Sequence, residues 1–150
     1  MYGMKVLLWD KDGTIKSWYG RYNSPTIWTP GEWQSAECRC ESSVFGGGYA
    51  YCLDHDHPPC QPIEGKQHAG CGFHAVTSSR SLREFIYWTL DPYLRILGDA
   101  VIYVLVEGGG DIAVHENGFR SQYMRIVETF ETLWDLEQAY NKIKEAQGES

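Results

Sequence analysis

Short, largely apolar runs bounded by turn signals predict strands over the first half of the chain. Residues 4–9 (MKVLLW) and 14–18 (TIKSW) flank the turn signal DKDG, a pattern typical of a β-hairpin. Short runs at 35–40 (SAECRC) and 49–53 (YAYCL) predict two further strands. Residues 71–76 (CGFHAV) predict another, after a stretch rich in proline and glycine.

The second half carries the clearest strand signals. Residues 100–107 (AVIYVLVE) form a β-branched run suited to a central strand. Residues 111–116 and 119–127 flank Asn117-Gly118, a dipeptide typical of tight hairpin turns. The glycines of EGGGD, residues 107–111, lack the Lys-Ser/Thr of a phosphate-binding loop, so we expect a flexible hairpin connection there.

Helical periodicity appears twice. Ser81 followed by Glu84 matches a capping box and predicts a helix beginning there. Its apolar face consists of Leu82, Phe85, Ile86 and Leu90. Thr132 and Asp135 can cap a second helix that runs to about Ala146. Its apolar stripe is Leu133, Leu136, Tyr140 and Ile143.

Together these elements predict an α+β fold that is mainly antiparallel β, with one internal helix and one C-terminal helix. Strands outnumber helices, and an antiparallel barrel or a curled sheet is the expected architecture. The sequence shows no internal repeat and no interdomain linker. Residues 1–150 therefore read as a single domain, long enough to bury its own core.

Composition narrows the class of function. Hydrophobic residues make up 43% and charged residues 22%, which is typical of a folded globular chain. The net charge of −7 opposes broad nucleic-acid binding, which depends on cations that neutralise phosphates. No secretory signal and no apolar run of membrane-spanning length is visible, so we expect a cytoplasmic protein, no membrane contact and mostly reduced cysteines.

Cysteines and histidines cluster in the middle of the chain. The candidates are Cys38, Cys40, Cys52, His55, His57, Cys60, His68, Cys71 and His74. Thiolate and imidazole are the ligands that zinc prefers, and ligation would offset the entropy of ordering residues 55–70, which have little apolar content. We predict a closed structural zinc site; the alternative is a set of unligated thiols, because no paired CxxC signature is present.

Several short motifs carry a family resemblance. IWTPGEWQSAEC, a histidine followed by proline, GCGFHAV and VLVEGGGDIAVHENGFRSQYMRIV occur in this order over most of the chain. The combination resembles a family of small uncharacterised actinobacterial and actinophage proteins with W-x-P-G-E…C, H-x-x-P, C-x-C-G-[IFY]-x-A and H-x-x-G-[FY]-R motifs. The resemblance implies a shared fold and supplies no activity.

The resemblance implies part of a ligand set. The cysteine after W-x-P-G-E matches Cys38, the H-x-x-P histidine matches His55, and the C-G-[IFY]-x-A cysteine matches Cys71. The remaining cysteine of the family pattern falls on Ala69 here, so one ligand must come from elsewhere. We choose Cys60, because thiolate holds zinc well and the PPC segment is rigid. His68 and Cys40 are alternatives to it, and His57 is a substitute for His55.

A second candidate site surrounds the late hairpin. His115, Arg120 and Tyr123 lie on strands that flank the turn, and His115 and Arg120 can approach one another across the antiparallel pair. A small anionic or nucleotide-like ligand could bind there. The alternative is that Arg120 pairs at the surface with Glu116 or with a C-terminal acid.

No catalytic motif stands out. No serine lies in a nucleophile elbow, and metal ligation would use the thiols available for a Cys–His pair. We therefore expect a non-enzymatic, zinc-stabilised binding domain with a protein partner, and the phage-like motifs suggest a modulator of a host protein. The first alternative is a nucleotide-like small-molecule binder that uses aromatic residues and Arg120. A zinc-dependent hydrolase is the second.

Overall fold

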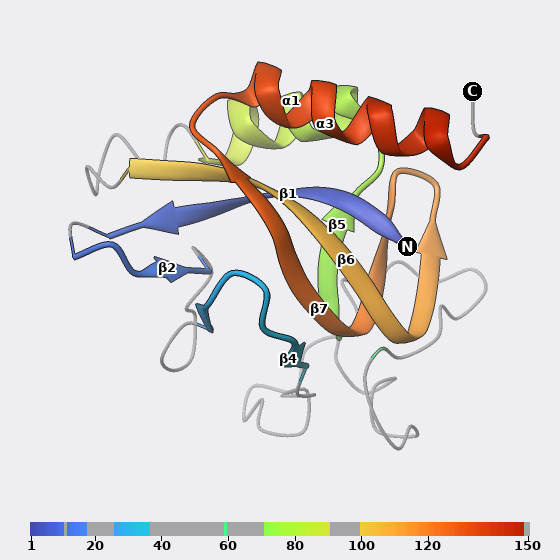
Figure 1. The fold of residues 1–150 in the computed structure, drawn as a ribbon, viewed down its shortest axis with the longest axis horizontal. Helices are drawn as coiled ribbons and strands as arrows, with labels where there is room; N and C mark the ends of the chain where they lie inside the picture. Colours follow the sequence, from blue (N-terminus) through green and yellow to red (C-terminus); the bar gives the residue numbers. More distant parts are fainter. Residues whose placement is uncertain (11, 18–25, 37–58, 60–70, 91–99, 149–150) are drawn as a thin grey trace.

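The fold is a curled antiparallel sheet with helices on its outer face (Figure 1). The computed structural model describes residues 1–10, 12–17, 26–36, 59, 71–90 and 100–148. Its strands are β1 (Tyr2–Trp9), β2 (Ile15–Lys16), β3 (Ile27–Trp28), β4 (Gln34–Ser35), β5 (Phe73–Val76), β6 (Ala100–His115) and β7 (Gly118–Phe130). Its helical segments are α1 (Ser79–Phe85), the π-helical η3 (Ile86–Leu90) and α3 (Leu133–Ala146). The predicted α+β class is confirmed.

Strand pairing brings the sheet back to its own first strand. β1 pairs with β6 along its whole length, β6 pairs with β7, and β7 pairs near its start with β5. β5 then returns to β1 through one residue pair, Met4 with Val76. Because this last contact is so short, the sheet is curled rather than a fully closed barrel. Of the two expected architectures, the curled sheet is the one that fits.

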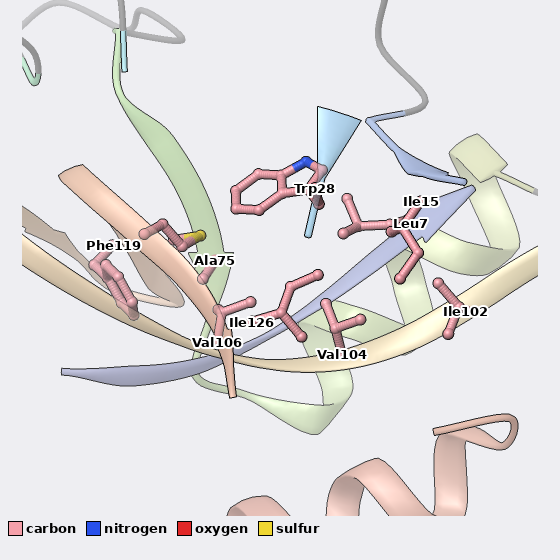
Figure 2. Close-up of a cluster of buried hydrophobic side chains, with 10 residues drawn as sticks. Leu7, Ile15, Trp28, Ala75, Ile102, Val104, Val106, Phe119 and Ile126 are labelled. Carbon is pink, nitrogen blue, oxygen red and sulfur yellow. The ribbon is translucent and has the colours of Figure 1, made fainter. Parts of the chain in front are cut away.

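The sheet buries apolar side chains on both faces, as alternation along β1 requires. Leu7 faces the inside of the curl, where it joins the cluster around Trp28 (Figure 2). Met4 and Val6 face outward, where they pack with Leu136 and Tyr140 of α3. The two clusters explain why strands of this protein read as nearly continuous apolar runs.

The predicted hairpin turns are present in the structure. β1 and β2 pair around the DKDG turn, where the Thr14 amide donates to Asp12 at 2.9 Å. Hydrogen bonds from Thr14 favour the charged carboxylate and so lower the pKa of Asp12 below its usual value. The largest effect comes from the Thr14 side chain, and the next from its amide. β6 and β7 are joined at Glu116–Asn117, as the Asn117-Gly118 signal predicted.

The helices pack on the outer face and are joined by an ion pair. Arg83 of α1 donates to both carboxylate oxygens of the buried Glu137 on α3, at 2.8–3.1 Å. The predicted cap of α3 is confirmed, since the Thr132 side chain accepts from the Asp135 amide. The predicted start of α1 at Ser81 is wrong, because Ser78 is the cap and accepts from the Ser81 amide. None of the described helices is long and apolar enough to cross a membrane.

The glycine run Gly108–Gly110 is not a hairpin connection, which corrects the prediction made for EGGGD. β6 continues through it to His115, and the register against β7 shifts between Gly109 and Ile112. Gly110 has φ +69, a backbone conformation that other L residues rarely adopt. The missing side chain at Gly108 leaves room for the Phe119 ring, which would collide with a Cβ atom there. The run is therefore a bend within one long strand.

We predict that Gly108→Ala lowers the free energy of unfolding by about 1–3 kcal/mol, because the added methyl group overpacks the fully buried Phe119. Urea unfolding measures the change. Gly109→Ala is the matched control, since its Cβ would lie 3.1 Å from the half-exposed Trp33 ring, which can move aside, and at an ordinary 3.9 Å from the Tyr123 Cβ. Equal losses for the two variants would contradict this account of the bend.

Candidate functional site

The candidate site lies on the outer face at the tip of the β6–β7 hairpin. His74 of β5 and Ala113 of β6 flank Arg120 of β7 as direct cross-strand partners. Directly opposed residues share a face of the sheet, and His115 follows Ala113 on that same face by two positions. Strand register alone therefore gathers two histidines around one arginine.

Arg120 is held inside the protein by two charge-assisted contacts. Its Nε donates to His115 Nε2 at 2.8 Å, and its Nη1 donates to the Cys71 carbonyl at 3.0 Å. None of its side chain is exposed. A guanidinium can only donate, so His115 accepts at Nε2 and carries its proton on Nδ1. The contact fixes both the orientation and the tautomer of this imidazole.

Cys71 connects this face to the cysteine–histidine segment of the sequence. The residue is buried, and the following Gly72 has φ +102. A Cβ at Gly72 would lie 3.0 Å from the ring of the buried Pro59 and 3.4 Å from the Cβ of Arg120. Pro59, from the centre of the predicted metal segment, therefore packs closely against Gly72, beside Cys71.

Most of the predicted metal ligands lie outside the described residues. These are Cys38, His55 and Cys60 of the preferred set and the alternatives Cys40, His57 and His68. Within the part of the chain that the structure describes, no three His, Cys, Asp or Glu side chains form a group that could hold a metal ion. Of the preferred four, only Cys71 is placed, and the zinc site stays a prediction.

The predicted ligand-binding residues do not form one surface. The expected proximity of His115 and Arg120 is confirmed by their hydrogen bond. The alternative in which Arg120 pairs at the surface is wrong, because its side chain is fully buried. Tyr123 lies past the register shift, on the stretch of β7 that pairs with β4. The Arg120 side chain therefore offers no exposed surface to a ligand.

Tyr123 belongs instead to a second exposed group, which we call the glycine-bend surface: Trp33, Glu107, Gly109, Tyr123 and Arg125. Trp33 lies over Gly109, with the Arg125 guanidinium 4.9 Å from the centroid of its ring. Arg125 is also paired with Glu107 at 2.7 Å. Trp33 and Tyr123 remain 48% and 39% exposed, so this surface presents two aromatic rings beside a guanidinium.

A third group, the helical aromatic surface, consists of Tyr87, Trp88 and Trp134. Tyr87 and Trp88 lie on η3, with ring centroids 4.8 Å apart in an edge-to-face arrangement. Trp134 lies in the first turn of α3. Phe85, Ile86 and Leu133, next to them in the sequence, all pack against the apolar cluster beneath the helices on the outer face (Figure 1). All three aromatic side chains are at least 65% exposed.

Sequence reasoning did not single out several of these residues. Trp33 appeared only within the motif IWTPGEWQSAEC, and Arg125 as one polar position in the predicted strand 119–127. Trp88 and Trp134 fall on the polar faces of predicted helices. That position is the sequence feature from which their exposure could have been predicted. A tryptophan on the solvent side of an amphipathic helix is a residue that packing does not explain.

Comparison with known proteins returned no family model, no curated protein and no solved structure that matches the chain.

We predict that Arg120→Met destabilises the protein by about 2–3 kcal/mol, because it removes charge-assisted hydrogen bonds in a buried setting. Thermal and urea unfolding measure the loss. Arg125→Met is the control: its partner Glu107 and its own side chain are partly exposed, so we expect a change below about 1 kcal/mol. Similar losses in both variants would show that Arg120 has no special structural part.

Proposed function

We propose that this protein is a non-enzymatic binding domain that recognises a protein partner through the helical aromatic surface. One observation carries the proposal: Trp88 and Trp134 are 74% and 66% exposed although both belong to the packed helical layer. Leaving large aromatic rings in water forgoes their burial energy, and such groups are typical of protein interfaces. The rest of the helical layer follows the usual pattern, with its apolar residues turned to the sheet.

Zinc ligation of the cysteine–histidine segment remains part of the proposal. Cys38, His55, Cys60 and Cys71 are the proposed ligands, with zinc in a structural role. The support from the fold is that Cys71 is anchored by Arg120 and that Pro59 packs beside it. A thiolate-rich zinc site carries net negative charge, and the buried guanidinium would offset it.

The resemblance to actinophage proteins gives the proposal its biological form. A small acidic domain with exposed aromatic residues suits a phage-encoded modulator that occupies a surface of a host protein. Such a modulator would act in the cytoplasm of the host.

The second candidate function is binding of a small nucleotide-like ligand, and the glycine-bend surface favours it. Trp33 and Tyr123 can offer stacking faces, and Arg125 takes the place foreseen for Arg120, which is enclosed. Stacking of a base on an aromatic side chain contributes about 1–3 kcal/mol. A zinc-dependent hydrolase ranks last, since no glutamate is spaced in the sequence to act as its general base.

We predict that the double substitution Trp88→Ala, Trp134→Ala weakens partner binding by at least about 30-fold, as loss of interface hot spots does. Titration calorimetry with a partner identified by affinity purification measures the change. The free energy of unfolding should move by less than about 0.5 kcal/mol, because both rings are exposed. Val114→Ala, also exposed, is the control, and unchanged binding by the double variant would refute the assignment.

We predict close to one zinc ion per chain in the purified protein, measured by inductively coupled plasma mass spectrometry; a content below about 0.3 would argue against one closed site. Cys71→Ser should lower both the zinc content and the melting temperature. Cys52→Ser, a cysteine outside the preferred ligand set, is the control and should retain zinc. A Cys71→Ser variant with an unchanged melting curve would indicate unligated thiols.

A further inference from the structure

The exposed aromatic residues of the helical layer lie toward one end of it. Arg83 of α1 pairs with Glu137 of α3, and Figure 1 shows the two helices running in opposite directions. Tyr87 and Trp88 come about one turn after Arg83 in the chain. Trp134 comes about one turn before Glu137. Because the helices are antiparallel, all three rings belong to the same side of the ion pair.

This end of the helical layer carries two acids without basic partners. Glu131 precedes the Thr132 cap of α3, Asp135 lies in the first turn of the helix, and both acids are exposed. Within the described residues neither of them forms an ion pair. The positive end of a helix dipole amounts to about half an elementary charge, so two carboxylates leave a net negative potential here.

The basic side chains of the described helices do not compensate these acids. Arg80 is paired with Glu84 at 3.0 Å, and Arg83 is paired with the buried Glu137 at 2.8 Å. The two lysines of α3 lie toward its other end. The aromatic rings therefore belong to a locally acidic surface.

We propose that the helical aromatic surface binds a basic segment of its protein partner, with arginine or lysine side chains on the rings of Trp88 and Trp134. The rings contact the aliphatic stems and cationic heads of these side chains, and Glu131 and Asp135 attract their charges. The net charge of −7 on the whole chain steers such a segment toward the protein. The inference rests on the proposed function and adds the chemistry of the partner.

The protein itself contains one contact of this kind. The Arg125 guanidinium lies 4.9 Å from the centroid of the Trp33 ring and is paired with Glu107 at 2.7 Å. The proposed contact repeats this combination of ring, guanidinium and carboxylate across an interface. Arginine is favoured over lysine, because its planar guanidinium stacks on an aromatic ring and can bind a carboxylate through two parallel hydrogen bonds.

The same two acids argue against other occupants of this surface. A two-fold contact between two copies of the chain would bring the acids of both copies together, and like charges across an interface are unfavourable. The anionic headgroups of a membrane would be repelled in the same way. A basic segment is the occupant whose charge complements the surface.

The test is binding of fluorescent peptides to the full-length protein, measured by anisotropy. Peptides of equal length alternate alanine with arginine, alanine with glutamine, or leucine with glutamine. We expect the arginine peptide to bind at least about tenfold more tightly than the other two. Trp88→Ala with Trp134→Ala should weaken its binding at least about tenfold, and Glu131→Gln with Asp135→Asn about fivefold.

The charge-matched control is Glu116→Gln with Glu145→Gln, which removes two exposed acids at the hairpin tip and the far end of α3. We expect it to change the affinity by less than about twofold. Equal weakening by the two charge variants, or no effect of the tryptophan substitutions, would assign peptide binding to net charge alone and overturn the inference.

Two further outcomes separate this inference from the proposed function. Tighter binding of the leucine peptide than of the arginine peptide, lost in the double tryptophan variant, would refute the basic partner and keep the aromatic surface as a binding site. Dimerisation in sedimentation experiments, or binding to phosphatidylserine vesicles, that is lost in the same variant would assign the surface to another occupant and also overturn the inference.

Discussion

The whole architecture depends on how the Phe119 ring packs against Gly3 and Gly108. A Cβ at Gly3 would lie 2.8 Å from the ring, and one at Gly108 would collide with it. Because both positions lack side chains, the tip of the β6–β7 hairpin can lie down against β1. Only then can β7 reach β5, and β5 reach β1, which curls the sheet and encloses the inner apolar cluster.

The same bend gives the protein its distinct outer surfaces. The helices cover the part of the outer face formed by β1 and the first half of β6, and they leave Trp88 and Trp134 in solvent. At the bend itself the outer face carries Trp33 and Arg125, and at the hairpin tip it carries the enclosed Arg120. Each candidate binding surface is thus defined by its position relative to the bend at Gly108–Gly110.

Arg120 links two features that looked independent in the sequence. The cysteine segment and the late hairpin are separated by about fifty residues, yet Arg120 Nη1 donates to the Cys71 carbonyl at 3.0 Å. A buried guanidinium with partners on both sides holds them in one arrangement, since losing either contact leaves a charge without its hydrogen bonds. The arginine that suggested an anion site is therefore part of the framework on which Cys71 rests.

The sequence alone determined the features that depend on local patterning. Residues that follow a period of two or 3.6 became strands and helices, the Thr132 cap was predicted correctly, and the hairpin at Asn117 was found. The start of α1 was misplaced, because Ser78 and Ser81 offer equivalent capping chemistry and local sequence does not choose between them. Proximity of His115 and Arg120 could be predicted because it follows from hairpin register alone.

Only the tertiary structure decided what each side chain faces. In the sequence Lys5 is one polar residue in an apolar strand, and the pairing of β1 with β6 places it on the same face as Val104 and Leu7. Arg120 has the pattern of a surface residue, yet in the structure it is buried and donates to the Cys71 carbonyl. EGGGD read as a connection because glycine is typical of turns, whereas β1 and β7 supply partners that keep β6 continuous. The physical reason is common to all three: burial depends on contacts between distant segments, and local periodicity carries no information about which segments meet.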